Sequence, residues 1–279
     1  MMTKTGIQIN KCFDLEQTLN CGQSFRWKEI EKTEEYSIWE GIAFGRLLQI
    51  RQDEDELTFF CSQQDYETVW YDYFDLAVNY EEMRETLAKQ SEPLKEATKF
   101  APGIRILRQD AWEALASFLF SQNNNIPRIK GIIERFAELC GEPIDGGFTF
   151  PAVETVAKMT VKDLEPIRAG FRAKYIIAAA RAIVESKVDL QAIREKDIHF
   201  GRYELQKIHG VGPKVAECTL LYGFHKTEAF PLDVWMKRAM NKLFPGKSPE
   251  EFGKHAGLAQ QYIFHYSRMH AELFQTPDT

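Results

Sequence analysis

The sequence predicts an α+β protein in which a small antiparallel sheet near the N-terminus is followed by an all-helical region. Before about residue 100, short runs of aromatic and aliphatic residues alternate with glycine or acidic turns, which is typical of an antiparallel meander. After Pro102 and Gly103, apolar residues recur with the 3.6-residue period of helices. We therefore expect an N-terminal sheet domain over 1–103 and a helical region over 104–279.

Local patterns place the individual elements in order. Strands are expected over 36–42, 45–51 and 56–61. Asp110 is a suitable N-cap for the first helix after the boundary, Pro127 suits the first turn of the next, and Gly141 ends that one. The expected helices lie over about 75–100, 110–121, 127–140, 152–168, 171–186, 202–208, 213–224, 233–244 and 249–272.

Charge is unevenly distributed along the 279 residues, whose net charge is −6. Residues 1–100 hold 11 Lys and Arg against 20 Asp and Glu, a net of −9. Residues 101–279 hold 24 against 21, a net of +3, together with all six His. Binding to phosphates needs a local basic face rather than a basic total, so the acidic average does not exclude a nucleic-acid partner.

Cysteine usage and hydropathy exclude several classes of protein. Five scattered Cys without a CxxC pair argue against a disulfide scaffold, a zinc site of that spacing or an iron–sulfur cluster. No apolar run approaches the roughly 18 residues needed to span a bilayer, and the first residues lack the pattern of a secretory signal. We therefore expect a soluble, intracellular protein with reduced thiols, no cofactor and no metal held by side chains.

Residues 208–215 read Ile-His-Gly-Val-Gly-Pro-Lys-Val between two short expected helices. Gly210 and Gly212 let a ligand come close to the backbone, and the free N–H groups at the start of the next helix form an anion site that suits a phosphate. A tight turn that needs glycine would explain the two glycines alone. The full pattern, over about 202–224, is that of a helix-hairpin-helix, which binds a DNA backbone without recognising bases.

Lys214 falls in the first turn of the second hairpin helix, where the positive end of the helix dipole favours the uncharged, nucleophilic amine. Cys218 shares its helix face and is a candidate to exchange a proton with the amine or to hold it. Taken singly, the lysine is also explained as a solvated side chain and the cysteine as a small core residue. Asp233 is an N-cap by position, and its carboxylate is also suited to stabilising a developing positive charge.

At several places the sequence resembles the helix-hairpin-helix base-excision DNA glycosylases and, more narrowly, the 8-oxoguanine DNA glycosylases. The matching segments are CGQSFRW at 21–27, SQNNNIPRI at 121–129, GFRAKY at 170–175, GVGPKVAEC at 210–218 with PLDV at 231–234, and LAQQYIF at 258–264. The resemblance covers nearly the whole chain and implies two helical subdomains after the sheet domain.

This resemblance implies a bifunctional DNA glycosylase and AP lyase. Lys214 would attack C1′ of the damaged nucleotide, displace the base and form a Schiff base, after which the 3′ phosphate leaves by β-elimination. Asp233 would stabilise the oxocarbenium-like sugar. The implied partner is double-stranded DNA that contains 8-oxoguanine opposite cytosine, bound by a monomer and without a membrane.

A base stacked in a duplex cannot be reached, so the target nucleotide must be flipped out. By resemblance, Asn123 fills the gap and Phe171 inserts beside it. Arg128 and Arg172 would contact the estranged cytosine. Outside the resemblance, Asn123 is explained as a turn cap, Arg128 as a solvated residue and Phe171 as core.

The pocket must distinguish 8-oxoguanine from guanine, whose N7 is an acceptor where the lesion carries a proton. By resemblance, Gly22 offers a backbone carbonyl to that N7. Gln260 and Phe264 share one helix face, so that the ring stacks on the flipped base while the amide binds its Watson–Crick edge. Cys218 would lie against the other face of the base.

Two positions depart from the family pattern. Trp235 stands where eukaryotic members usually carry a phosphate-contacting histidine, and Tyr222 replaces a smaller or more flexible residue near the pocket. Two other functions stay open at this point. One is a glycosylase of the same superfamily for another damaged purine, which usually lacks the lysine; the other is a non-catalytic helix-hairpin-helix DNA-binding protein, which needs no Lys/Asp pair.

Overall fold

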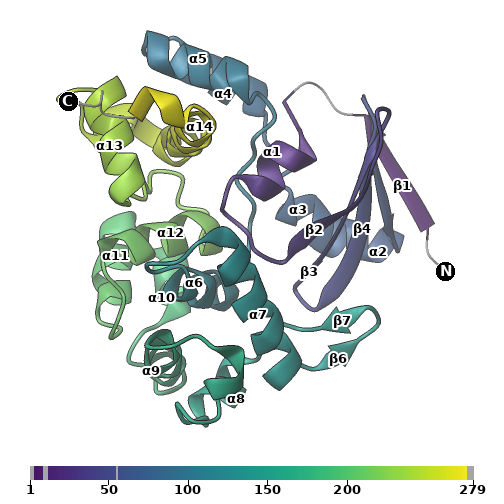
Figure 1. Ribbon diagram of the computed structural model, residues 1–279, viewed down its shortest axis with the longest axis vertical. Helices are drawn as coiled ribbons and strands as arrows, with labels where there is room; N and C mark the ends of the chain where they lie inside the picture. The colour runs from purple at the N-terminus through teal and green to yellow at the C-terminus, as the bar shows by residue number, and fades with distance from the viewer. Residues whose placement is uncertain (1–2, 9–11, 55, 275–279) are drawn as a thin grey trace.

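The computed structural model describes residues 3–8, 12–54 and 56–274, and its N-terminal part is a five-stranded antiparallel sheet (Figure 1). The strands, in the spatial order β1-β5-β4-β3-β2, are β1 (Thr3–Gln8), β2 (Trp27–Lys32), β3 (Ser37–Ala43), β4 (Arg46–Gln52) and β5 (Glu56–Cys61). The three expected strands are confirmed as β3, β4 and β5. The edge strands β1 and β2 were not predicted. In β2, five of the six residues are exposed and carry no alternating apolar pattern that could indicate a strand.

One face of the sheet packs on an aromatic core. This core is closed by α1 (Leu15–Asn20), η1 (Tyr66–Trp70) and α3 (Tyr71–Tyr73), whereas the short α2 (Gln63–Asp65) before η1 has no buried residue. Trp27 donates its indole N–H to the hydroxyl of Tyr73 at 2.8 Å. A Cβ at Gly41 would lie 2.3 Å from the Trp27 ring, so glycine at this position lets the ring pack flat on β3.

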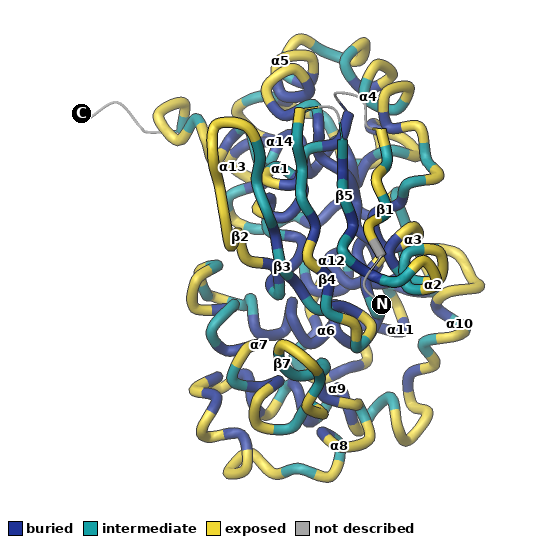
Figure 2. Tube along the Cα trace, turned by 90° about the vertical axis from the view of Figure 1, so that its right-hand side faces the viewer, coloured by how far each residue is buried: buried dark blue, intermediate teal, exposed yellow. Residues whose placement is uncertain are grey.

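The helical region is centred on α6 (Ala111–Phe120), all ten residues of which are buried. Asp110 caps it as expected, with the carboxylate accepting from the N–H of Glu113 at 2.9 Å. Around α6 lie α7 (Ile126–Cys140), α8 (Val153–Ala157), η2 (Glu165–Ile167), α9 (Arg172–Val184), α10 (Leu190–Glu195), α11 (Ile198–Gln206), α12 (Pro213–Gly223) and a hairpin of β6 (Pro143–Ile144) and β7 (Gly147–Phe148). Figure 2 shows this buried centre, with exposed residues gathered on outer elements such as α5 and α8.

A second group of helices joins segments from both ends of the chain. It comprises α4 (Tyr80–Ala88), α5 (Glu92–Phe100), α13 (Val234–Leu243), η3 (Pro249–His255), α14 (Ala256–Met269) and η4 (Ala271–Phe274). In Figure 1, α4 and α5 lie beside α14 and away from the sheet, and Leu87 and Leu94 belong to the core of the helical region. The two hydrophobic cores do not divide at one position of the chain, because Cys21 and Phe25 belong to the core of the helical region and Leu107 belongs to the core under the sheet. The boundary expected at 103 follows the change of sequence pattern and stays a prediction.

Three expected helices are interrupted in the structure. The prediction for 75–100 was wrong between α4 and α5, which are separate helices. The prediction for 152–168 was wrong after α8, because the Asp163 carboxylate accepts from the backbone N–H and the hydroxyl of Thr160, at 2.7 and 2.8 Å, and closes a turn. The prediction for 249–272 was wrong at Gly253, whose φ of +71° interrupts the helical backbone within η3, before α14 begins. In the part of the chain that the structure describes, no helix is both long and apolar enough to cross a membrane.

Candidate active site

The expected helix-hairpin-helix is formed by α11 and α12, and its two glycines have different surroundings. Gly210 adopts φ +94°, and a Cβ there would lie 2.4 Å from Cγ of Tyr175, so the protein itself requires glycine. Gly212 is the N-cap of α12 with an extended backbone, and a Cβ there would meet nothing within 4 Å. The hairpin is therefore fixed by packing at Gly210 and open to a ligand at Gly212.

A cavity of about 460 Å³ lies at the start of α12, where four distant segments of the chain meet. Gly22 reaches it from the loop after α1, Lys214 from α12, Asp233 from the start of α13 and Phe264 from α14. The volume is within the usual range for pockets that enclose a small molecule or a single base. Four of the predicted site residues thus line one cavity although up to 242 positions separate them in the sequence.

The Lys214 amine is held by neutral groups. Its Nζ donates to Oγ of Ser121 at 2.9 Å and lies 5.1 Å from the centroid of the Phe118 ring. Because the Ser121 hydroxyl donates its own proton to the carbonyl of Phe118 at 2.8 Å, it acts toward the amine as an acceptor. No carboxylate of the described residues forms an ion pair with Lys214, so no salt bridge has to be broken before the amine reacts.

Asp233 is held in place by the helix that it begins. Its Oδ1 accepts from the backbone N–H of Met236 at 2.7 Å, as an N-cap does. The N-cap explanation and the functional one are therefore compatible, because the same carboxylate lines the cavity that contains Lys214. Cap geometry fixes the carboxylate, and a fixed carboxylate needs little reorganisation when positive charge develops nearby.

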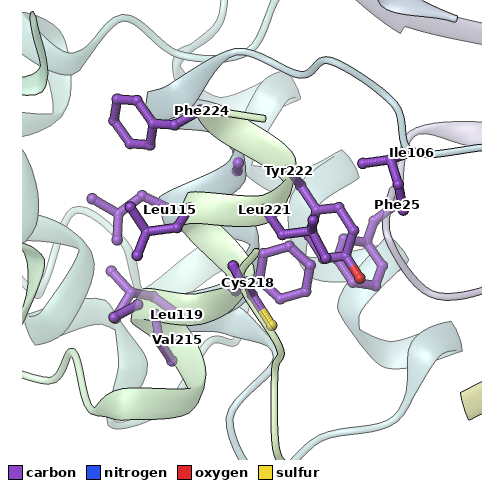
Figure 3. Close-up of a cluster of buried hydrophobic side chains, with 14 of the residues drawn as sticks. Phe25, Ile106, Leu115, Leu119, Val215, Cys218, Leu221, Tyr222 and Phe224 are labelled. Atoms are coloured by element: carbon purple, nitrogen blue, oxygen red, sulfur yellow. The ribbon is translucent and has the colours of Figure 1, made fainter. Parts of the chain in front are cut away.

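Cys218 lies in the apolar cluster of α6 and α12, which also contains Leu115, Leu119 and Leu221 (Figure 3). Burial raises the pKa of its thiol to about 11, although the adjacent Lys214 amine lowers it. The thiol is therefore uncharged at neutral pH and is a poor acceptor for the proton of the amine. Of its two expected relations to Lys214, this environment favours holding over proton exchange.

The loop that carries Gly22 is held by hydrogen bonds that the sequence pattern did not reveal. Gly22 adopts φ +85°, a region that favours glycine, and its nearest neighbour on the Cβ side is the Phe264 ring at 3.5 Å. Gln23 is fully buried next to it, and its amide bonds the backbone at Thr18 (2.9 Å), Arg105 (2.7 Å) and Leu107 (2.8 Å). These bonds fix the backbone of Gly22 at the cavity wall.

Comparison with known proteins agrees with the family resemblance found in the sequence. Residues 6–115 match the family model of the 8-oxoguanine DNA glycosylase N-terminal domain, and residues 116–258 match that of the HhH-GPD superfamily of base excision DNA repair proteins. The chain belongs to the 8-oxoguanine DNA glycosylases.

Relatives of this glycosylase are found among curated proteins and solved structures. The N-glycosylase/DNA lyase of Saccharomyces cerevisiae is 36% identical over 83% of this chain and 69% of that protein. A solved structure of MBOgg1 in complex with a low-affinity DNA ligand has a TM-score of 0.90 and 39% identity, covering 96% of both chains. The Clostridium acetobutylicum 8-oxoguanine glycosylase/lyase, in complex with dsDNA containing cytosine opposite 8-oxoG, has a TM-score of 0.88 and 34% identity, covering 97% of this chain and 98% of that one.

The residues expected at the DNA gap gather on one side of the glycosylase. Asn123 and Arg128 are exposed, and the Phe171 side chain is 49% exposed. Arg172 differs, because it is buried and its guanidinium donates to the backbone carbonyls of Gln122, Asn123 (2.8 Å) and Ala169 (3.2 Å). In this structure its donors position the Asn123 loop, so its contact with cytosine stays a prediction.

Gln260, a predicted pocket residue, and Tyr222, one of the two departures from the family pattern, are both buried and are not among the residues that line the cavity. Gln260 is 4% exposed, and its amide oxygen accepts from Gln261 at 2.8 Å. Tyr222 is buried and stacks on Phe118 with ring centroids 5.2 Å apart, while its hydroxyl accepts from Gln261. The departure at Tyr222 thus supplies an aromatic support for Phe118, which lines the cavity.

The Trp235 departure has a structural explanation. The indole N–H donates to Oγ of Ser267 at 2.8 Å, which joins the start of α13 to α14. Since indole has one donor, Trp235 has none left for a phosphate. The sequence analysis assigned no role to Ser121 or Arg268, which both line the cavity. The available signals were the place of Ser121 at the start of the matching segment 121–129 and the spacing of Arg268 four residues after Phe264.

The glycosylase offers no side-chain metal site in the part of its chain that the structure describes. Among those residues, no group of three or more His, Cys, Asp or Glu side chains could hold a metal ion.

Proposed function

We propose that this protein excises 8-oxoguanine from duplex DNA and then cleaves the strand, with Lys214 as nucleophile and Asp233 as the stabilising carboxylate. The observation that carries the proposal is the meeting of both side chains with Gly22 and Phe264 in one cavity at the start of α12. The relatives support it, since they are named N-glycosylase/DNA lyase.

The reaction follows from an amine and a carboxylate placed beside one anomeric carbon. The amine of Lys214 attacks C1′, the bond from C1′ to the base breaks, and the base leaves with a proton. Asp233 stabilises the positive charge that the sugar carries as that bond breaks. Opening of the sugar ring gives a Schiff base, loss of a proton from C2′ follows, and the bond from C3′ to the phosphate oxygen breaks.

The lesion is recognised at N7 and by stacking. We assign the backbone carbonyl of Gly22 to the N7 proton of 8-oxoguanine, because the Gln23 amide fixes this loop at the cavity wall. Guanine would place a lone pair against the same carbonyl and be repelled. Phe264 stacks on the flipped base. Cys218 supports the opposite side, and Gln260 binds the Watson–Crick edge after its amide turns away from Gln261.

Opposite-base recognition is assigned to the exposed residues beside the cavity. Asn123 fills the gap left by the flipped nucleotide, and Phe171 inserts next to it. Arg128 contacts the estranged cytosine, and Arg172 reaches it only by giving up bonds to the backbone carbonyls of its loop. The Clostridium acetobutylicum complex, whose DNA carries cytosine opposite 8-oxoG, supports the choice of partner base.

The decisive experiment measures cleavage and borohydride trapping on duplexes with 8-oxoguanine opposite each of the four bases. Wild type should excise the lesion, become covalently trapped and prefer cytosine. K214Q should lose excision and trapping but retain DNA binding, whereas K89Q, a change at an exposed lysine outside the cavity, should match wild type. Excision by K214Q would refute the role of the amine, and excision of other purines in preference to 8-oxoguanine would refute the substrate.

We also propose that the enzyme acts as a monomer on cellular DNA, in the nucleoid if the cell is prokaryotic. All residues of the proposed site come from one chain, so no second copy is needed to complete it. Light scattering of the free enzyme and of its complex with one duplex should give a single protein chain in each; a dimer in either would contradict the proposal.

A further inference from the structure

Arg268 is a cationic residue at the edge of the cavity. It lies on α14 one helical turn after Phe264, and both side chains line the cavity. Its guanidinium carbon lies 5.5 Å from the centroid of the Phe264 ring, so the ring that stacks on a flipped base also orients the arginine.

The charge of Arg268 is not neutralised within the described protein. Its guanidinium forms no hydrogen bond or ion pair with any residue that the structure describes, and the side chain is exposed. The charged side chains that line the cavity are Lys214, Asp233 and Arg268. Lys214 must be uncharged to attack the sugar, and Asp233 is needed by the sugar cation, so Arg268 is the cation left to meet an anion there.

The indole of Trp235 cannot bind an anion in place of Arg268. Trp235 lines the same cavity, but its N–H is already donated to Ser267, the residue directly before Arg268. That bond joins the start of α13 to α14 and so fixes the segment of α14 that carries Arg268. A nucleotide that enters the cavity brings one phosphate on each side of its sugar, and both remain at the edge.

We propose that Arg268 is a positioning residue that binds a phosphate flanking the flipped nucleotide. This inference rests on the proposed base flipping into the Lys214 cavity. An arginine suits the task because its planar fork donates two hydrogen bonds to one phosphate and keeps its charge at all relevant pH values. The contact holds the sugar in front of the Lys214 amine while the base stacks on Phe264.

The test measures binding to a duplex with a tetrahydrofuran abasic analogue opposite cytosine, which retains both phosphates but has no base. At low salt, R268A should bind about tenfold more weakly than wild type. Its plot of log affinity against log salt should be shallower by about 0.9, the value for one phosphate contact. R268K should retain the slope because it retains the charge. R46A, which removes an exposed arginine from β4 outside the cavity, should retain both affinity and slope.

A second measurement identifies the phosphate itself. A methylphosphonate is placed 5′ or 3′ of the abasic analogue, which removes the charge of one phosphate at a time. On one of these two duplexes, R268A should bind no more weakly than wild type, since the contact is already lost. A full tenfold loss on both duplexes, or an unchanged salt slope, would overturn the proposal. A loss confined to duplexes that contain 8-oxoguanine would show that Arg268 contacts the base instead. Borohydride trapping of wild type tests the proposed function separately and does not depend on Arg268.

Discussion

Gly210 and Gly212 lie two residues apart in the hairpin, and the structure predicts opposite consequences for the same substitution. In G210A, the new Cβ would lie 2.4 Å from Cγ of Tyr175, and alanine would be held at φ +94°. The backbone conformation costs about 1–3 kcal/mol, and moving the packed ring costs a similar amount. We expect G210A to lower the free energy of unfolding by about 3 kcal/mol.

G212A should leave folding nearly unchanged. Gly212 has φ −96° and ψ −178°, which alanine adopts without strain, and its Cβ would meet nothing within 4 Å. The cost at this N-cap should stay below about 1 kcal/mol. The added methyl instead occupies the open side of the hairpin, where a DNA phosphate has to approach the N–H groups of α12. Loss of one such charged hydrogen bond should weaken DNA binding about tenfold.

Urea denaturation and fluorescence anisotropy on an abasic-analogue duplex separate the two effects. The expected pattern is an unstable G210A and a stable G212A that binds DNA poorly. A G210A variant as stable as wild type would show that the contact with Tyr175 is easily relieved. A G212A variant that binds DNA like wild type would show that the phosphate does not approach on this side.

Three further predictions concern the amine, a buried acid and the opposite base. S121A removes the acceptor that lies 2.9 Å from Nζ of Lys214, so single-turnover excision should fall about fivefold without a change in DNA affinity. T219V, which loses a buried hydroxyl on α12, the helix that carries Lys214, should match wild type. An unchanged rate in S121A would contradict the role assigned to the Ser121 hydroxyl. Burial raises the pKa of Glu113 to about 7 from an ordinary value near 4.5, so its contribution to stability is present below about pH 4.5 and is lost as the pH rises through 7. Urea denaturation should therefore show E113Q gaining about 3 kcal/mol relative to wild type between pH 4.5 and pH 8, and a difference independent of pH would refute this. R128A should reduce the preference for cytosine opposite the lesion about tenfold in excision assays, and unchanged selectivity would show that Arg128 does not contact that base.

Features specified by neighbouring residues were predicted well. Asp110 and Asp233 both cap helices as their positions indicated, each accepting a backbone N–H three residues later. The helix-hairpin-helix formed where its glycines and Pro213 placed it. These features depend on contacts within a few residues, which a sequence pattern records directly.

The sequence analysis did not predict the hydrogen bonds that side chains form with partners far away along the chain. Arg172 was expected to face DNA, but the structure buries it against carbonyls of a loop about 50 residues earlier in the chain. The roles of Gln23 and Trp235 depend in the same way on Leu107 and Ser267, which lie 84 and 32 positions away. No periodicity or motif in the sequence specifies such pairs.

The sequence by itself therefore determined the order of sheet and helices, the hairpin and the helix caps, and its resemblance to a family indicated the amine and the carboxylate that we propose for the reaction. Only the tertiary structure decided that Gly22, Lys214, Asp233 and Phe264 share one cavity, and that Arg268 also lines it without an ion-pair partner among the residues that the structure describes. The physical reason is that caps and turns are set by short-range backbone hydrogen bonds, whereas the cavity exists because the loop after α1, the starts of α12 and α13, and α14 pack together and bring side chains that are remote along the chain to one place.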